Sequence, residues 1–211
     1  MREYHKIKTV YTRNPETNYK TLIEGEFASP EFKFLADNTW TWTEKIDGMN
    51  IRTMWDGESI IFGGKTDRAQ IPAELLNRLN ERFLPKKELF VKTFDYVNPQ
   101  ACFYLEGVGP KIQKGGGNYG DKQDVVLFDI RIGEWWLKRT DVEEIAEIFD
   151  LPVSPIIGYG TLYDMIELTK MGFISEYGIF KAEGIVARPE VELKARNGSR
   201  IITKIKFKDF V

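Results

Sequence analysis

The stretch WTWTEKIDGMNIRTMWDGESIIF, residues 40–62, indicates the fold class. Residues 40–43 and 50–55 are rich in aromatic and β-branched side chains, which favour strands. Asp56-Gly57 is a turn signal and precedes a second apolar segment, residues 59–62. We therefore predict an antiparallel hairpin over residues 40–62, with Lys45 at the end of a strand.

The other elements that the sequence predicts alternate irregularly between strand and helix. Apolar runs predict buried strands at residues 101–105 and 125–130, a third strand that contains Trp135 and Trp136, and strands at residues 184–188 and 200–207. Helical spacing predicts helices over residues 72–83, over residues 140–149 with a capping-box pattern, and over residues 161–171 with a stop near Gly172. This order predicts an α+β fold of antiparallel sheets flanked by helices, forming one domain over residues 1–211. We expect Trp135 and Trp136 in the core.

The composition is that of an ordinary globular chain. Its 211 residues are 42% hydrophobic and carry a net charge of −2. Since there is no apolar run of about 18 residues and no apolar N-terminal stretch, we expect neither a membrane span nor a secretory signal. The lone cysteine, Cys102, cannot form an internal disulfide, which favours a cytoplasmic, reducing environment. We expect a monomer.

The scarcity of histidine and cysteine limits the possible chemistry. The chain has one of each, His5 and Cys102, which excludes zinc sites with several such ligands and argues against Cys-His catalysis. We expect His5 at the surface and Cys102 in the core. Any catalysis must therefore use lysines, carboxylates and a metal ion.

Positive charge is distributed unevenly along the chain. Seven basic residues lie between Arg188 and Lys208, against two glutamates, and a smaller group surrounds a glycine run at Lys111, Lys114 and Lys122. Such groups form either a solvated face or a phosphate-binding groove, and both interpretations stay open at this point. The glycine run does not have Walker-type spacing, so a P-loop is excluded.

Lys45 is the candidate nucleophile. A lysine attacks only as the neutral amine, which requires a pKa lowered by burial or by neighbouring cations. Alternation along residues 204–206 places the side chains of Lys204 and Lys206 on one face of a strand and Ile205 on the other, so both ammonium groups could supply that influence.

Polar residues also follow or interrupt the apolar strands further along the chain, at Glu106, Asp129 and Glu183. Carboxylates on core strands are costly unless they are paired or bind a metal, so the repeated pattern needs a common explanation. Salt bridges on edge strands would account for one such residue. A shared phosphate and metal site accounts for all of them together with the lysines.

This ordered set resembles the lysine-adenylylating nucleotidyltransferases, which include RNA ligases, DNA ligases and mRNA capping enzymes. The resemblance covers about residues 40–208 and rests on EKIDGMN (44–50), Glu106-Gly107, Phe128-Asp129, EGIV (183–186) and KIK (204–206). Asn50 and the segment GPKIQKG (109–115) make the chain most like the nick-sealing RNA ligases of phages and of trypanosome RNA editing. Lys65-Thr66 stands where that branch usually has Arg-Thr, and a lysine cannot form the two-pronged phosphate contact of an arginine.

The resemblance implies an ATP-dependent RNA ligase that joins 3′-hydroxyl and 5′-phosphate ends through a lysyl-AMP intermediate and an adenylylated 5′ end. It implies ATP and Mg²⁺ or Mn²⁺ as cofactors, and RNA or an RNA/DNA hybrid as the partner. Lys45, Lys204 and Lys206 would be catalytic, and Asp129 and Glu183 would orient the metal. The nucleotide-binding residues would be Glu44, Lys45, Ile46, Asn50, Lys65, Glu106, Phe128, Glu183, Lys204 and Lys206, with Phe128 stacked on adenine.

DNA ligases and capping enzymes of this superfamily carry an oligonucleotide-binding barrel after the last lysine pair, whereas this sequence ends five residues beyond Lys206. We therefore expect no such barrel, which favours an RNA ligase, encoded by a cell or by a phage that acts in the host cytoplasm. Three alternatives remain: an adenylyltransferase module that needs a partner to join strands, a DNA ligase-like enzyme, and a non-catalytic nucleic-acid-binding protein.

Overall fold

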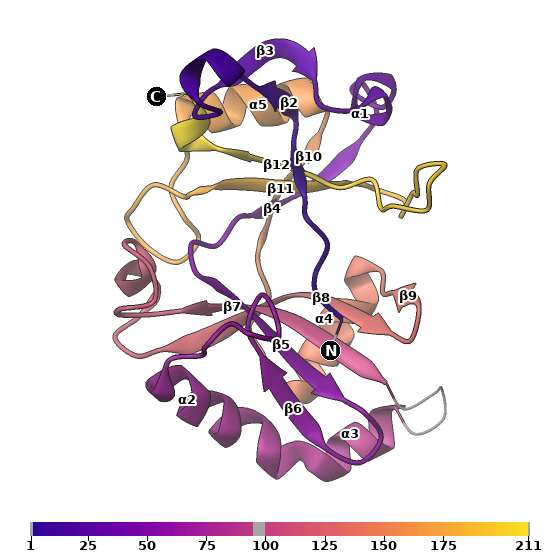
Figure 1. Cartoon of the computed structure of the whole chain (residues 1–211), viewed down its shortest axis with the longest axis vertical. Coiled ribbons are helices and arrows are strands. Elements are labelled where there is room, and N and C mark those ends of the chain that lie inside the picture. Colours follow the sequence, from indigo (N-terminus) through magenta and orange to yellow (C-terminus); the bar gives the residue numbers. More distant parts are fainter. Residues whose placement is uncertain (1, 95–99, 211) are drawn as a thin grey trace. The chain divides into compact units, whose positions relative to one another are not determined.

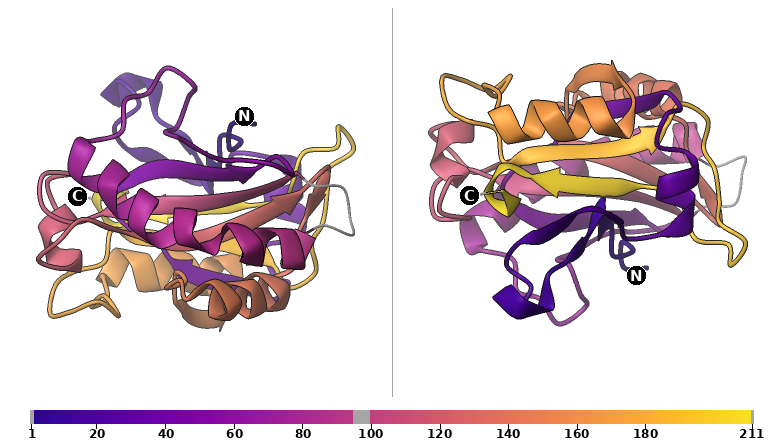
Figure 2. Two further views of the ribbon diagram at one scale, coloured as in Figure 1. Left: turned by 90° about the horizontal axis from the view of Figure 1, so that it is seen from below. Right: turned by 90° about the horizontal axis from the view of Figure 1, so that it is seen from above.

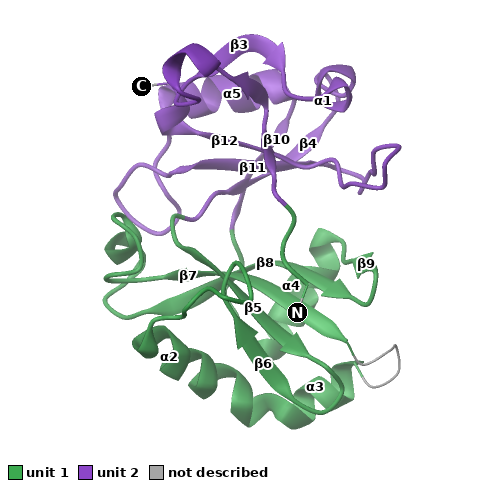
Figure 3. Ribbon diagram, in the orientation of Figure 1, with its two compact units in different colours: residues 1–5, 47–154 green, residues 6–46, 155–211 purple. Residues whose placement is uncertain are grey.

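The computed structural model describes residues 2–94 and 100–210. The chain divides into two compact units, which we describe one at a time (Figure 3). Unit 1 comprises Met1–His5 and Asp47–Ser154, and unit 2 comprises Lys6–Ile46 and Pro155–Val211. None of the helices in the described ranges is long and apolar enough to cross a membrane.

Unit 1 is built on one antiparallel sheet of five strands. Their order is β6 (Ile60–Gly63), β5 (Met49–Trp55), β7 (Ala101–Val108), β8 (Asp124–Ile132) and β9 (Trp135–Trp136). The pairing of β7 with β8 shifts register between Tyr104 and Leu105, which leaves Phe128 as an extra residue on β8. Two short 3-10 helices, η2 (Leu84–Lys86) and η3 (Gly116–Tyr119), complete the unit.

Three helices supply the core that covers one face of this sheet: α2 (Ala73–Phe83), α3 (Lys87–Phe94) and α4 (Arg139–Phe149) (Figure 1). Their buried side chains include Phe83, Phe90 and Phe149, which pack with Phe103 of β7. Because side chains alternate along a strand, the neighbours of these core residues project from the other face of the sheet. That face carries the polar residues that the sequence singled out in this unit.

Unit 2 contains a second five-stranded sheet. Its order is β1 (Lys8–Thr9), β12 (Thr203–Lys206), β11 (Gly184–Pro189), β4 (Trp40–Glu44) and β10 (Ile156–Gly160), with a parallel pairing only between β1 and β12 among the described strands. A separate hairpin pairs β2 (Tyr11–Arg13) with β3 (Leu22–Phe27), with η1 (Pro15–Thr17) between them.

One face of this second sheet packs against helix α5 (Leu162–Met171), which lies along β11 and β12 (Figure 2). Buried residues of α5 meet Trp40 and Trp42 of β4 and Ile185 and Ile205 of β11 and β12 in a single core. The short helix α1 (Pro30–Phe34) adds Phe32 to this core, and η4 (Phe207–Asp209) follows β12. The opposite face of the sheet therefore receives the alternate residues of the same strands.

The α+β class with antiparallel sheets is confirmed, and no closed barrel is present among the described strands. The predicted hairpin over residues 40–62 is only half right. Strands β5 and β6 do pair across Asp56, whose Oδ1 accepts hydrogen bonds from two turn amides. Strand β4, however, belongs to the sheet of unit 2, since both edges of β5 are already taken by β6 and β7.

The helices predicted at residues 72–83 and 161–171 are confirmed, and Thr161 caps α5 in a reciprocal pair with Asp164. The capping box predicted for residues 140–149 is wrong. Helix α4 begins one residue earlier, and its N-cap, Lys138, has no side-chain acceptor to offer.

Two further predictions need correction. Trp135 is not in the core: its exposed fraction is 74%, because β9 is a two-residue strand at the edge of its sheet. Trp136 is only half-buried. The strand expected at residues 200–207 is shorter, covering Thr203–Lys206, and Arg200 instead forms an isolated bridge with Lys194.

Candidate active site

The end of strand β4 in unit 2 holds Lys45 in contact with a carboxylate. The backbone amide of Lys45 donates to the Gly184 carbonyl over 2.9 Å, which continues the pairing of β4 with β11. The Lys45 ammonium donates to Oε2 of Glu183 over 2.6 Å, and the Lys206 ammonium lies 2.6 Å from Oε1 of the same residue. One carboxylate thus bridges two lysines. The exposed fractions of the three side chains are 18% for Lys45, 12% for Glu183 and 20% for Lys206.

Lys204 adds a third cation to this face of the sheet. In the pairing of β11 with β12, Val186 lies opposite Lys204 and Gly184 lies opposite Lys206, while Ile205 is wholly buried in the core. This confirms the predicted alternation, in which both lysines share one face. Burial, followed by the charges of Lys45 and Lys206, lowers the pKa of Lys204 to about 8.

The charge on Glu183 is set by its two lysine partners. Burial alone opposes ionisation of this carboxyl, but the charges and hydrogen bonds of Lys45 and Lys206 outweigh it and hold its pKa below the ordinary value. Glu183 is therefore an ionised acceptor placed directly on the candidate nucleophile. Lys45, Glu183, Lys204 and Lys206 thus form one cluster rather than separate ion pairs, whereas Glu106 and Asp129 lie in the sheet of unit 1.

Glu44 has different contacts from its neighbour Lys45. It is 1% exposed, and its carboxylate accepts hydrogen bonds from the Ser175 hydroxyl (2.5 Å) and from the Glu176 amide (2.9 Å). Burial raises the pKa of this carboxyl, although both hydrogen bonds oppose the shift. Ile46 is buried as well. A nucleotide contact of Glu44 and Ile46 stays a prediction, and the structure gives Glu44 the additional role of anchoring the segment before Glu183.

The turn after Lys45 is fixed by close backbone packing within unit 1. The Asp47 amide donates to the Tyr119 hydroxyl over 3.0 Å. A Cβ atom on Gly48 would lie 2.2 Å from the Gly107 carbonyl oxygen and 2.8 Å from Cγ of Glu106, so only glycine fits there. The Lys-x-Asp-Gly pattern therefore has a structural reason at its final position.

Asn50 and Glu106 are direct cross-strand partners in the pairing of β5 with β7, on the sheet face opposite the helices. The Asn50 Oδ1 atom is buried, and no hydrogen-bond partner reaches it among the described residues. A buried oxygen atom of this kind is suited to accept a hydrogen bond from a bound ligand. Lys65 is exposed in the loop after β6. Nucleotide contacts for these three residues stay predictions.

Phe128 and Asp129 lie at the irregular point of the pairing of β7 with β8. Asp129 is fully buried and its Oδ2 accepts a hydrogen bond from the Tyr4 hydroxyl over 2.8 Å. The Tyr4 ring meets Phe128 edge-on, with ring centroids 5.1 Å apart, and also contacts Tyr104 and Trp136. The N-terminal segment is thereby part of this face, which no sequence signal had indicated.

The comparison with protein families decides the identity of the chain. The model of the RNA ligase family, described as "RNA ligase", matches residues 38–206, which include every predicted site residue. The chain belongs to the RNA ligase family. A search of curated protein sequences gave no match.

Solved structures of an RNA ligase from Naegleria gruberi have a similar fold. Naegleria gruberi RNA ligase with PPi matches with a TM-score of 0.68 and 15% identity, over 98% of this chain and 56% of that one. A variant of that ligase with ATP and Mn gives a TM-score of 0.65, 15% identity and coverage of 84% and 52%. A further variant with AMP and Mn gives a TM-score of 0.67 and 14% identity, over 98% of this chain and 56% of that one. This chain thus spans about half the length of the solved chains that it matches.

Within this RNA ligase family member, the predicted metal ligands are engaged by protein groups. Both oxygens of Glu183 accept from lysines, and Asp129 accepts from Tyr4. The residues described by the structure contain no group of three or more His, Cys, Asp or Glu side chains that could hold an ion. Mg²⁺ at nucleotide sites is usually bound by one or two carboxylates together with phosphates and water, and metal roles for Glu183 and Asp129 stay predictions.

Other side chains were judged correctly or missed by the sequence analysis. Cys102 is buried, which confirms its predicted place in the core, and burial raises the pKa of its thiol to about 11. His5 packs against Tyr4 and Trp136 and is only half-exposed. The residues missed are those that hold the predicted ones: Tyr4, Ser175, Tyr119 and Arg52.

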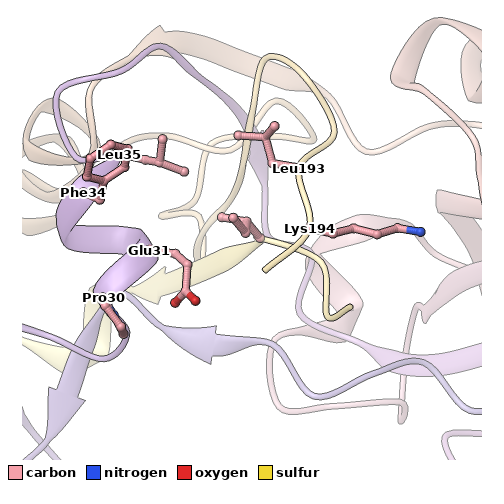
Figure 4. A pocket seen from close by; sticks show the side chains of 7 residues that line it. Pro30, Glu31, Phe34, Leu35, Leu193 and Lys194 are labelled. Atoms are coloured by element: carbon pink, nitrogen blue, oxygen red, sulfur yellow. The ribbon is translucent and has the colours of Figure 1, made fainter. Parts of the chain in front are cut away.

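A separate hollow of about 380 Å³ in unit 2 contains none of the predicted site residues (Figure 4). It lies between helix α1 and the segment after β11, and its lining includes Phe34, Leu193 and Ile201. The lysine cluster, rather than this apolar hollow, is the candidate active site.

Proposed function

We propose that this chain is an ATP-dependent RNA ligase that forms a lysyl-AMP intermediate on Lys45. The contact that carries the proposal is the bridge from Lys45 through Glu183 to Lys206, with Lys204 beside it. Membership of the RNA ligase family supplies the reaction class.

In the first step, Nζ of Lys45 attacks the α-phosphorus of ATP. An N–P bond forms, the bond from the α-phosphorus to the bridging oxygen breaks, and pyrophosphate leaves. The ammonium must lose a proton before it attacks, and Glu183 accepts a hydrogen bond from it over 2.6 Å. Its position supports a role as the base or as the group that orients Lys45.

Lys204 and Lys206 would hold the α-phosphate. Two ammonium groups on one strand face are suited to the charge that builds on the phosphoryl oxygens in the transition state. Glu183 fixes the Lys206 side chain in advance, so little reorganisation is needed when the nucleotide binds.

In unit 1, we assign Phe128 to stacking on adenine and Glu106 to the ribose, with Asn50 and Lys65 as further polar contacts. Tyr4 meets Phe128 with its edge at 89°, which supports the orientation of the Phe128 ring. A divalent ion, Mg²⁺ or Mn²⁺, would neutralise phosphate charge when bound, as the ATP and Mn complexes of the Naegleria ligase suggest.

AMP would then pass to a 5′-phosphate, releasing Lys45, and a 3′-hydroxyl would displace AMP to close the strand. We propose RNA, or RNA paired with DNA, as the substrate, and a monomeric cytoplasmic enzyme of the nick-sealing type. The single-domain interpretation of residues 1–211 belongs to this proposal.

The test is a mass measurement after incubation with ATP and Mg²⁺. We expect one added AMP, mapped to Lys45, and none in Lys45→Ala. Lys92 is an exposed lysine on helix α3, so Lys92→Ala is the matched control and should take up AMP as the wild type does. An unmodified wild-type chain, or AMP mapped elsewhere, would contradict the proposal.

A second candidate is an adenylyltransferase module that attaches AMP to itself but joins strands only with a partner. It is favoured by the match of this chain to about half of each solved ligase. Nicked duplexes with RNA on the 3′-hydroxyl side separate the two candidates. A complete ligase seals them, whereas the module accumulates lysyl-AMP without sealed product, and equal sealing of all-DNA nicks would reject the RNA preference.

A further inference from the structure

Arg52 is the only arginine with no exposed surface in the described part of the chain. It lies on β5 directly opposite Tyr104 of β7, on the sheet face away from the helices. Two residues before it on the same strand is Asn50, which shares this face because side chains alternate. A buried guanidinium is costly unless its donors are satisfied, so its partners indicate what it is for.

Two of its partners lie in the loop that follows strand β6. Nε of Arg52 donates to the Gly64 carbonyl over 2.7 Å, and the guanidinium NH2 group donates to Oδ1 of Asp67 over 2.9 Å. The two acceptors flank Lys65 and Thr66. One side chain therefore holds both ends of a four-residue segment.

The remaining contacts of this loop make it a compact turn. The Ala69 amide donates to the Thr66 carbonyl over 3.1 Å, and a Cβ atom on Gly64 would lie 2.8 Å from Cβ of Ala69. Lys65 and Asp67 are nevertheless exposed. The buried Arg52 side chain is thus a fixed support beneath an exposed segment.

We propose that Arg52 is a positioning residue that fixes the backbone of Lys65 for its phosphate contact. This inference rests on the proposed function, because Lys65 acts there on the nucleotide or nucleic acid. A guanidinium is needed for the geometry, since its planar fork reaches a carbonyl and a carboxylate at once. A lysine at position 52 could satisfy only one of them well, and a methionine neither.

The test measures the rate of lysyl-AMP formation against ATP concentration, and the rate of strand joining, in Arg52→Met, Arg52→Lys and Asp67→Asn. We expect Arg52→Met to change at least one of these measurements about ten- to a hundredfold, as loss of positioning typically does. Either the rate of lysyl-AMP formation or of strand joining falls, or the ATP concentration for half-maximal lysyl-AMP formation rises. Arg52→Lys should recover part of this loss, and Asp67→Asn, which keeps the Gly64 bond, should lose less. Arg68→Met, an exposed arginine of the same loop, is the matched control and should behave like the wild type.

A double variant decides whether Arg52 acts through Lys65. If it does, Lys65→Ala combined with Arg52→Met is no slower than Lys65→Ala alone. Additive losses, or an Arg52→Met enzyme with wild-type kinetics, overturn the proposal. Thermal unfolding of each variant separates a general loss of folding from this effect.

Hydrogen exchange gives a readout that does not need catalysis. Amides 65–69 should exchange at least about tenfold faster in Arg52→Met while those of β7 keep their protection. If the wild type takes up no AMP but this local exchange is seen, the proposed function fails and the positioning role of Arg52 stands. Unchanged exchange in this loop removes the positioning role even in an active ligase.

Discussion

The ammonium of Lys45 donates a 2.6 Å hydrogen bond to Glu183, and the second oxygen of that carboxylate holds Lys206. The proposed nucleophile and a proposed phosphate-binding lysine are therefore coupled through one residue. An amine attacks only after it has lost its proton, and Glu183 is in direct contact with the ammonium that must lose it.

Glu183→Gln should lower lysyl-AMP formation by at least about a hundredfold, as removal of one transition-state contact typically does. The amide keeps the size of the carboxyl but can neither accept the proton nor hold both lysines as an anion. The rate is measured by quenched mass spectrometry at saturating ATP. Glu176→Gln, whose contact to Glu44 uses only the backbone, is the control, and a Glu183→Gln enzyme within tenfold of wild type would remove Glu183 from the mechanism.

The lowered pKa of Lys204 predicts a pH dependence of ATP binding. Its folded value of about 8 lies below the ordinary 10.5, so the positive charge is lost as pH rises through 8. Affinity for a non-hydrolysable ATP analogue should therefore fall between pH 7 and pH 9. Lys204→Arg stays charged over this range and should show a flatter profile; profiles that coincide would show that Lys204 does not hold phosphate.

The Lys204 ammonium has the opposite effect on folding: its contribution to stability rises with pH, whereas its contribution to ATP affinity falls. Between about pH 8 and 10.5 the unfolded chain binds more protons at Lys204 than the folded one, so this residue makes the folded state more stable as pH rises through that window. Urea unfolding of the wild type and of Lys204→Met separates this contribution from the other lysines. A Lys204→Met variant with the wild-type pH slope would contradict the burial of the charge.

The sequence predicted this cluster because its members leave local signals. Alternation in β12 was enough to place Lys204 and Lys206 together, and burial of Ile205 confirms it. Contacts such as Glu44 with Ser175, which are 131 residues apart, leave no periodic trace, so their partners could not be found. The same holds for Tyr4 and Asp129, which are 125 residues apart.

Elements were missed or misplaced for a related reason. Helix α1 has five residues, too few to show a 3.6-residue period, and β1 has two. The assignment of β4 to a hairpin with β5 failed since adjacent strands usually pair, whereas β4 pairs with β11, about 140 positions away. Strand identity was therefore predictable from composition, and strand partners were not.

Gly48→Ala should destabilise unit 1 by about 1–3 kcal/mol, the usual cost of overpacking. Its added methyl would sit 2.2 Å from a backbone oxygen of Gly107, which cannot move without disturbing β7. Thermal unfolding measures the change. Gly117→Ala meets nothing within 4 Å and serves as the matched control, so equal stability of the two variants would show that the turn after Lys45 is looser than described.

Glu44 allows its structural and nucleotide-binding roles to be separated. Its raised pKa means that ionisation costs stability as pH rises from the unfolded value of 4.5 through the folded one. Glu44→Gln removes this cost and can still accept from the Glu176 amide and donate to Ser175, so its stability at pH 7 should equal or exceed that of the wild type. Glu44→Ala leaves a buried amide and hydroxyl without an acceptor and should cost about 1–3 kcal/mol.

The ATP concentration needed for half-maximal lysyl-AMP formation in Glu44→Gln then tests whether Glu44 binds the nucleotide. Because both carboxylate oxygens already accept hydrogen bonds from Ser175 and Glu176, we expect that ATP concentration to change by less than about twofold. The stable Glu44→Gln enzyme is informative because a loss of affinity cannot be attributed to unfolding. A tenfold weaker response to ATP would instead mean that the nucleotide displaces one of these two hydrogen bonds, and that Glu44 contacts the ligand as the resemblance implied.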